Sequence, residues 1–231
     1  MPADRGDAAL DDPVGASLRG RHAHLARRLG RAAAYVPDVA TFAAVSADPD
    51  AAEWDDLARL LGRGGLADMF SSPAVPPPDW EPVFVLDGLQ MVWDGPPPED
   101  GPGADVVVLG ADRVPEMLDL AERTRPGPFW PRTRELGAYV GVQGDGGLAA
   151  MAGERLRPPG WTEISAVCTA PEARGRGLAA RLVRALVARA AARGERPFLH
   201  VAAANTGAVT LYERLGFAVR KPVTFRGFRV P

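Results

Sequence analysis

The sequence contains a single cysteine, Cys168, and a single lysine, Lys221, among 231 residues. One cysteine excludes an intrachain disulfide and a cysteine-based metal cluster. No run approaches the roughly 18 apolar residues that a membrane span needs. The acidic segment 1–12 has no apolar core of the kind found in secretory signals. We therefore expect a cytoplasmic protein with no membrane partner.

The sequence also lacks the common signatures of nucleotide, metal and nucleic-acid binding. It has no Gly-x-Gly-x-x-Gly, no Gly-Lys-Ser/Thr and no His-Glu-x-x-His. The formal net charge is -2 and the aromatic content is 7%. A near-neutral chain without an aromatic stacking platform gives no general attraction to nucleic acid. We expect neither a metal site nor a nucleic-acid partner.

The most informative segment covers residues 163–180, where the pattern predicts a strand, a loop and the start of a helix. A helix N-terminus attracts anions because it carries unpaired N–H groups and a partial positive charge. Gly175 and Gly177 allow close approach of the backbone to a ligand, and Arg174 and Arg176 add charged donors. This combination predicts a pyrophosphate site, although the loop taken alone is also compatible with a solvated basic turn.

A second segment lies roughly 30 residues downstream and reads Asn-Thr-Gly-Ala-Val-Thr-Leu-Tyr-Glu-Arg-Leu-Gly-Phe. It matches the pattern Asn-x-x-Ala-x-x-x-Tyr-x-x-x-Gly-Phe, and the loop matches Arg/Gln-x-x-Gly-x-Gly/Ala. The matching residues are Arg174, Gly177, Ala179, Asn205, Ala208, Tyr212, Gly216 and Phe217. In this order and spacing, the chain resembles the GNAT superfamily of N-acyltransferases over residues 104–231.

The resemblance implies an α/β fold with a mixed central sheet and flanking helices. It also implies an N-acetyltransferase that moves an acetyl or short acyl group from acetyl-CoA or another acyl-CoA to a primary amine, by direct attack in a ternary complex and without a metal. The acceptor would be a small-molecule or peptide amine, bound largely by residues 123–136. A homodimer is one candidate assembly. The alternative is a non-catalytic acyl-CoA sensor or interaction module with the same fold.

The resemblance further assigns a cofactor site. The strand after Glu163 should expose main-chain N–H groups to the pantetheine arm, and the loop should hold the pyrophosphate. The expected cofactor-binding residues are Val167, Cys168, Thr169, Arg174, Gly175, Arg176, Gly177, Leu178, Ala179 and Asn205. The thiol of Cys168 is expected to be a buried apolar group and not a nucleophile.

Two side chains are candidates for proton transfer. Alternation along the strand places Glu163 on the cleft face with Ser165, Val167 and Thr169, where its carboxylate could act as the general base. The alternative is that it pairs with an arginine or binds a cationic substrate. By resemblance, Tyr212 would protonate the departing thiolate, unless it simply packs between helix and sheet.

The chain is expected to divide at a Pro/Gly linker over residues 95–103. Residues 1–94 would form a smaller N-terminal α/β region, either a degenerate half of the same fold or a lid or interface layer. Its predicted helices cover 14–29 and a second segment that starts at Asp48 or Asp50 and runs to Leu61, and its predicted strands cover 39–45, 66–70 and 82–93. In residues 104–231 the expected strands are 105–109, 139–142, 148–155, 162–169, 198–202, 217–219 and 224–229, and the expected helices are 112–122, 132–136, 178–192 and 206–215.

Overall fold

A computed structural model describes residues 7–96, 103 and 105–231. Its main feature is an eight-stranded sheet in the order β4-β11-β5-β10-β9-β8-β7-β6. Among the strand pairs of this sheet in the described residues, β9–β10 is parallel and the others are antiparallel, so the sheet is mixed. The strands are β4 (Leu66–Asp68), β5 (Glu81–Trp93), β6 (Val106–Val108), β7 (Tyr139–Gly144), β8 (Gly147–Glu154), β9 (Trp161–Thr169), β10 (Arg196–Ala202) and β11 (Phe217–Arg229).

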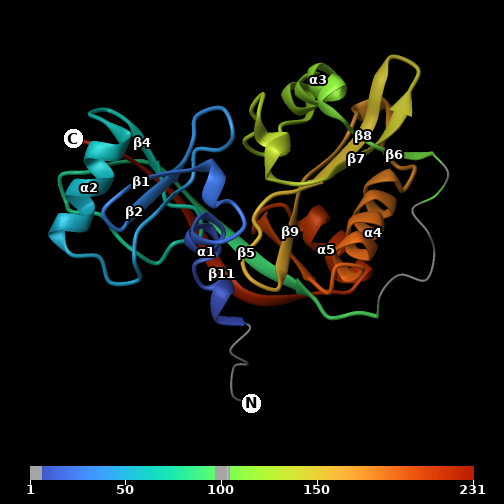
Figure 1. Cartoon of the computed structure of the whole chain (residues 1–231). Helices are drawn as coiled ribbons and strands as arrows, with labels where there is room; N and C mark the ends of the chain where they lie inside the picture. The colour runs from blue at the N-terminus through green and yellow to red at the C-terminus, as the bar shows by residue number, and fades with distance from the viewer. Residues whose placement is uncertain (1–6, 97–102, 104) are drawn as a thin grey trace.

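Three helices pack on this sheet. They are α3 (Val114–Thr124), α4 (Leu178–Ala191) and α5 (Thr206–Leu215), and α3 and α4 lie on opposite sides of β7 and β8 (Figure 1). Leu178, Leu182 and Leu186 recur every four residues on the buried face of α4. The fold class predicted from the sequence, a mixed central sheet with flanking helices, is thereby confirmed.

The first part of the chain adds a small layer beside one end of the sheet (Figure 1). This layer contains a three-stranded sheet made of β1 (Ala26–Leu29), β2 (Ala32–Tyr35) and β3 (Ala43–Ala44). The helix α2 (Ala51–Leu61) packs on β1 and β2. Asp50 caps α2 by accepting a bond from the N–H of Glu53, and Gly62 ends it with φ 81°. This helix therefore begins and ends where the sequence predicts.

The helix predicted over 14–29 is wrong in length. α1 (Pro13–Arg19) ends at Gly20, and the following residues form a short turn and then β1. Glycine disfavours helix continuation, and the buried His22 ring bonds the hydroxyl of Tyr35 (2.8 Å) and the carbonyl of Leu136 (3.0 Å), so this segment is held by tertiary contacts.

Two further predictions differ from the structure at the strands. The segments 217–219 and 224–229 are parts of the single long strand β11, which continues through a register shift between Val219 and Lys221. The predicted strands 39–45 and 66–70 are reduced to the two residues of β3 and the three residues of β4. A bulge can keep a strand continuous through an irregular residue such as Arg220.

The predicted division at residues 95–103 does not divide the large sheet. β5 precedes that segment, yet it lies inside the sheet between β10 and β11, and β4 pairs with β11 at the edge. Most of the predicted linker, residues 97–102, lies outside the described residues. The first part of the chain thus contributes directly to the sheet that carries the site described below.

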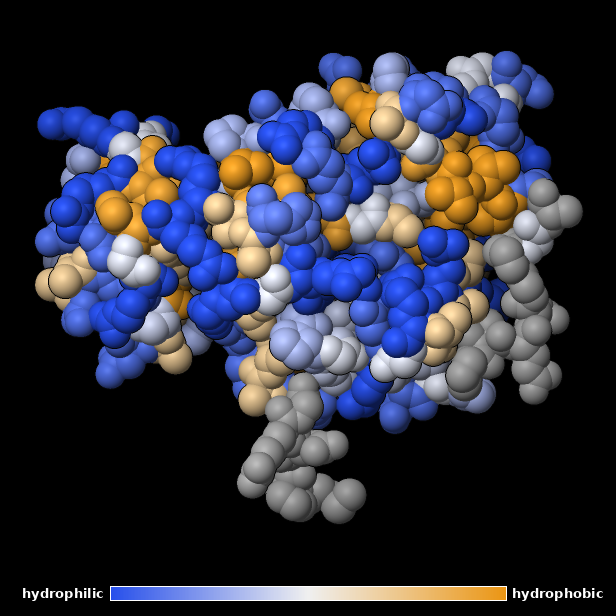
Figure 2. All heavy atoms as spheres, in the orientation of Figure 1, coloured by the Kyte–Doolittle hydropathy of each residue, from blue (hydrophilic) through white to orange (hydrophobic). Residues whose placement is uncertain are grey.

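Most of the apolar side chains are interior. Met91, Met117, Leu120, Tyr139 and Met151 are among those with almost no exposed surface. The face of the molecule shown in Figure 2 is mainly hydrophilic with scattered hydrophobic areas. Among the residues that the structure describes, no helix combines the length and the apolar character needed to cross a membrane.

Candidate active site

The site begins where β9 and β10 separate. The two strands pair in parallel only from Trp161 to Glu163 on β9, opposite Arg196 to Phe198 on β10. Both strands then continue, to Thr169 and Ala202, without further pairing between them. A cavity of about 400 Å³ opens there. Its lining at this end consists of Ile164, Ser165, Ala166, Val167, Val201, Ala202, Asn205, Ala208 and Tyr212.

A bulge in β9 changes which residues face the cavity. Between Met151 and Gly153, two positions along β8, the partner on β9 moves by three, from Cys168 to Ser165. The extra residue is accommodated at Ala166, which has φ 52°, a conformation that is costly for a residue with a Cβ. Ala166 and Val167 have no partner in the β8–β9 register. The simple alternation predicted along this strand is therefore interrupted, and the four consecutive residues from Ile164 to Val167 all line the cavity.

The Arg/Gly loop reaches solvent directly before α4. Gly175 and Gly177 have φ of 75° and 72°, and a Cβ added to either would have nothing within 4 Å. Gly177 is also the N-cap of α4, so no side chain bonds the first N–H groups of the helix. Arg174 and Arg176 are exposed on either side of Gly175. An open helix N-terminus between two arginines fits a diphosphate group.

The other predicted cofactor residues lie nearby but in different settings. Val167 lines the cavity, whereas Cys168 points into the core and its burial raises the pKa of the thiol. Thr169 pairs with Ala150 of β8 and is half-buried. Leu178 is buried and Ala179 half-buried in the first turn of α4.

Asn205 and Tyr212 both line the same end of the cavity. The Oδ1 of Asn205 accepts a bond from the N–H of Ala208 (3.2 Å) and caps α5. Tyr212 lines the cavity with 8% of its surface exposed and packs edge-on against Phe217. Burial, together with the nearby Cys168, raises the pKa of Tyr212 to about 12. The phenol therefore keeps its proton at neutral pH.

The expectation that the Glu163 carboxylate faces the cleft is wrong. Its side chain is 0% exposed. Arg155 donates two bonds to it, from Nε to Oε2 (2.8 Å) and from Nη2 to Oε1 (2.6 Å), and the N–H of Leu156 donates a third. Although burial opposes the shift, Arg155 and His200 lower the pKa of Glu163 to about 2. Such a carboxylate is a weak base, so the alternative prediction, pairing with an arginine, describes it.

His200 and Arg155 are the residues that sequence reasoning missed here. The Nδ1 of His200 lies 2.7 Å from Oε1 of Glu163, and its Nε2 lies 3.2 Å from Nε2 of Gln90. The amide nitrogen of Gln90 can only donate, so His200 accepts at Nε2 and donates from Nδ1. Burial lowers the pKa of His200, and the ring is neutral. No sequence motif marked this arrangement, because its members come from β5, β10 and the loop after β8.

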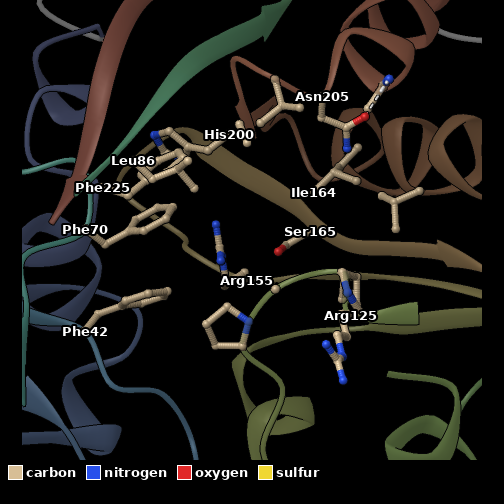
Figure 3. Close-up of a pocket in the computed structure, with 18 of the residues that line it drawn as sticks. Phe42, Phe70, Leu86, Arg125, Arg155, Ile164, Ser165, His200, Asn205 and Phe225 are labelled. Atoms are coloured by element: carbon tan, nitrogen blue, oxygen red, sulfur yellow. Dashed lines mark hydrogen bonds between the residues drawn. The ribbon is translucent and has the colours of Figure 1, made fainter. Parts of the chain in front are cut away.

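The cavity continues from Arg155 towards β4 along an aromatic wall. Figure 3 shows Phe42, Phe70 and Phe225 on one side of the cavity, with the guanidinium of Arg155 projecting between this wall and Ser165. Phe70 stacks on Phe225 with 4.6 Å between ring centroids, and Arg155 lies 4.5 Å from the ring centroid of Phe70. This part of the cavity is suited to an apolar group.

Asp68 closes the far end of the cavity. It is 4% exposed, and its Oδ2 accepts a bond from the hydroxyl of Thr41 (2.6 Å). Its Oδ1 is buried and has no hydrogen-bond partner among the described residues. Burial raises the pKa of Asp68 to about 6, although Thr41 and Arg155 act in the opposite direction.

The loop after α3 covers the cavity from the other side. Arg125, Pro126, Gly127 and Pro128 line it, within the segment 123–136 that was expected to bind the acceptor. The aromatic residues of this segment lie elsewhere, because Phe129 packs edge-on against Tyr139 and Trp130 is 39% exposed. The loop therefore borders the cavity through backbone, prolines and one arginine.

Comparisons with known proteins agree with this geometry. The FR47-like protein family model matches residues 139–225. A protein of the GNAT family from Novosphingobium aromaticivorans has a crystal structure that is 43% identical in sequence, with a TM-score of 0.87 over 96% of this chain and 98% of that one. A GCN5-related N-acetyltransferase from Kribbella flavida is 19% identical, covers 96% of each chain and has a TM-score of 0.62, which shows the fold alone. Among curated proteins, no sequence matches.

The identity to the Novosphingobium protein extends over nearly the whole of both chains, including the first hundred residues. The chain belongs to the GNAT family of acetyltransferases. Acetyl-CoA is the co-substrate of proteins with this fold, and the open helix N-terminus at Gly177 and the parted strands fit its diphosphate and its pantetheine arm.

Proposed function

We propose that the protein is an N-acetyltransferase that transfers an acetyl or short acyl group from acyl-CoA to a primary amine, by direct attack of the amine within a ternary complex. The observation that supports this most strongly is the parting of β9 and β10 next to the bulge at Ala166. It brings unpaired main-chain positions, Tyr212 and an acceptor cavity to one place.

Each group of residues at the site has a separate proposed role. Arg174, Arg176 and the N–H groups that follow Gly177 would hold the diphosphate. Main-chain N–H groups at Ala166 and Val167 would stabilise negative charge on the acyl oxygen. Neither position pairs with β8 or β10, so their N–H groups are free of sheet hydrogen bonds, while the paired residues Ser165 and Cys168 on either side hold the bulge in place.

Tyr212 is the proposed proton donor. Its raised pKa keeps the phenol protonated, and a departing thiolate beside it could take that proton. When bound, acyl-CoA supplies the activated acyl group. Glu163 is not proposed as the base, since it is enclosed by Arg155 and His200.

The first test is calorimetric titration of the protein with acetyl-CoA, free CoA and ATP, followed by release of free thiol in the presence of an amine panel. Binding of acetyl-CoA with amine-dependent thiol release supports the proposal. Tight binding of acetyl-CoA without turnover of any amine would favour an acyl-CoA sensor. No binding of either CoA compound would refute an acyl-CoA site.

A further inference from the structure

Asp68 is a buried carboxylate in the acceptor cavity with half of its hydrogen-bonding capacity unused. Thr41 bonds Oδ2, whereas Oδ1 is buried without a partner among the described residues. Leaving a buried charged atom unpaired is costly. A ligand donor that pairs with Oδ1, after a small shift of the side chain because this atom has almost no exposed surface, would remove this cost. A cationic donor does so best, because it both donates the hydrogen bond and compensates the negative charge.

The position of Asp68 separates it from the acyl-transfer end. In the order β4-β11-β5-β10, it lies three strands away from the strand that borders the parting. Neighbouring strands are about 4.8 Å apart, which gives roughly 14 Å along the sheet. Asp68 is therefore too far from Tyr212 to touch the reacting amine, and a group bound to it would be a second one on the same acceptor.

The cavity has an apolar wall between its two ends, and two arginines also line the cavity: Arg125, which is exposed to solvent, and Arg155. The apolar wall consists of Phe42, Phe70, Phe84, Leu86 and Phe225. The charge of Arg155, which also borders it, is compensated by the two bonds to Glu163. An alkyl or aryl segment would bury apolar surface there, whereas a carboxylate near Asp68 would be repelled.

We propose that Asp68 binds a second cationic group of the acceptor, and that the preferred acceptors are elongated diamines with an apolar middle. This inference rests on the proposed function, because it names the substrate class of the same cavity. One amine reacts beside Tyr212 while the other donates to Oδ1 of Asp68. The reacting amine, as the free base, forms the bond to the acyl carbon while the C–S bond breaks, the departing thiolate takes the proton of Tyr212, and a proton of the reacting nitrogen restores the phenol. The distal ammonium group keeps its proton and its charge.

The test compares three ten-carbon acceptors that differ at one end: decylamine, decane diamine and ω-aminodecanoic acid. With saturating acetyl-CoA, kcat/KM should be at least tenfold higher for the diamine than for decylamine, as expected for a charge-assisted hydrogen bond. The amino acid should be the poorest of the three. In Asp68→Asn, the ratio of kcat/KM for decane diamine to kcat/KM for decylamine should fall to within about threefold of one.

Two further variants sharpen the test. Asp79→Asn removes an exposed carboxylate outside the cavity and should keep the wild-type ratio. Thr41→Val removes the hydroxyl that lowers the pKa of Asp68, so the diamine preference should appear at higher pH than in the wild type. A wild-type ratio near one, or a full preference retained in Asp68→Asn, would overturn the proposal.

Binding measurements distinguish a failure of this inference from a failure of the proposed function. If no amine is acetylated, the acyltransferase proposal fails. Calorimetric titration of decane diamine and decylamine into wild type and Asp68→Asn then still decides the role of Asp68. Diamine binding that is at least tenfold weaker in the variant supports it, and equal binding, or binding to neither protein, refutes it.

Discussion

Glu163→Gln provides a direct test of the buried network. The substitution keeps the shape of the side chain but leaves the positive charge of Arg155, whose pKa is raised by its pairing with Glu163, without its counter-ion. Removing one partner of a buried ion pair costs about 3–5 kcal/mol. For a domain of this size, that corresponds to a loss of roughly 6–20 °C in Tm.

The pH dependence follows from the sign of the shift. The pKa of Glu163 is lowered from 4.5 to about 2, so its stabilisation is fully present above pH 4.5 and is lost only as the pH falls towards 2. The difference in unfolding free energy between wild type and Glu163→Gln should therefore be constant from pH 6 to pH 9. Urea unfolding followed by circular dichroism at several pH values measures it.

A double-mutant cycle with Arg155→Met isolates the ion pair. The double variant should be more stable than Glu163→Gln, because no unpaired charge remains. At a temperature where all variants are folded, kcat of Glu163→Gln should fall less than tenfold, since loss of a general base costs about 10²–10⁴. Wild-type stability combined with a loss of more than a hundredfold in kcat would refute the structural role.

Three other predictions concern the cavity and the loop. Tyr212→Phe should lower kcat at least tenfold while calorimetry shows an unchanged Kd for acetyl-CoA; an unchanged kcat would contradict its role as acid. Gly177→Val should weaken acetyl-CoA binding at least tenfold and lower stability by about 1–2 kcal/mol, because φ is 72° there, and wild-type affinity would contradict the loop's role. The pKa of Asp68 is raised from 3.8 to about 6, so its contribution to wild-type stability falls as the pH rises through this window, by about 3 kcal/mol in all. Asp68→Asn should gain stability relative to wild type between pH 4 and pH 7 in thermal unfolding scans, and a constant difference would contradict the raised pKa.

Elements with local signals were predictable. α2 has an aspartate cap and a glycine stop, and α5 has Asn205 as its cap and Gly216 after its last residue. These signals act within a few residues, so a single sequence reveals them. The position of β5 is different, because its partners β10 and β11 come more than a hundred residues later, and no local pattern specifies that pairing.

The residues of the site also fall into two groups, those that local sequence motifs predict and those whose surroundings depend on distant parts of the sequence. The Arg/Gly loop and the pair Asn205 and Tyr212 belong to contiguous motifs; the loop directly precedes α4, and Asn205 and Tyr212 line the cavity. The prediction that Glu163 faces the cleft was wrong because its side-chain partners are distant in sequence or on other elements. Arg155 directly follows β8, and His200 lies on the neighbouring strand β10. The bulge at Ala166 further broke the two-residue alternation on which the argument for the strand depended.

Ala166 and Asp68 share a property that separates them from the rest of the cavity, because each is unfavourable for stability. Ala166 has a left-handed backbone conformation, and Asp68 is a buried acid with an unpaired oxygen and a raised pKa. Strain and unpaired charge persist where the surrounding structure enforces them, and they gather at functional sites. Glu163 is the opposite case. Its carboxylate accepts hydrogen bonds from three residues, Arg155, Leu156 and His200, and its pKa is lowered, so it stabilises the fold. Glu163 and Asp68 therefore differ in role: Glu163 holds β9 to its neighbours, and Asp68 is the carboxylate that we propose binds a ligand.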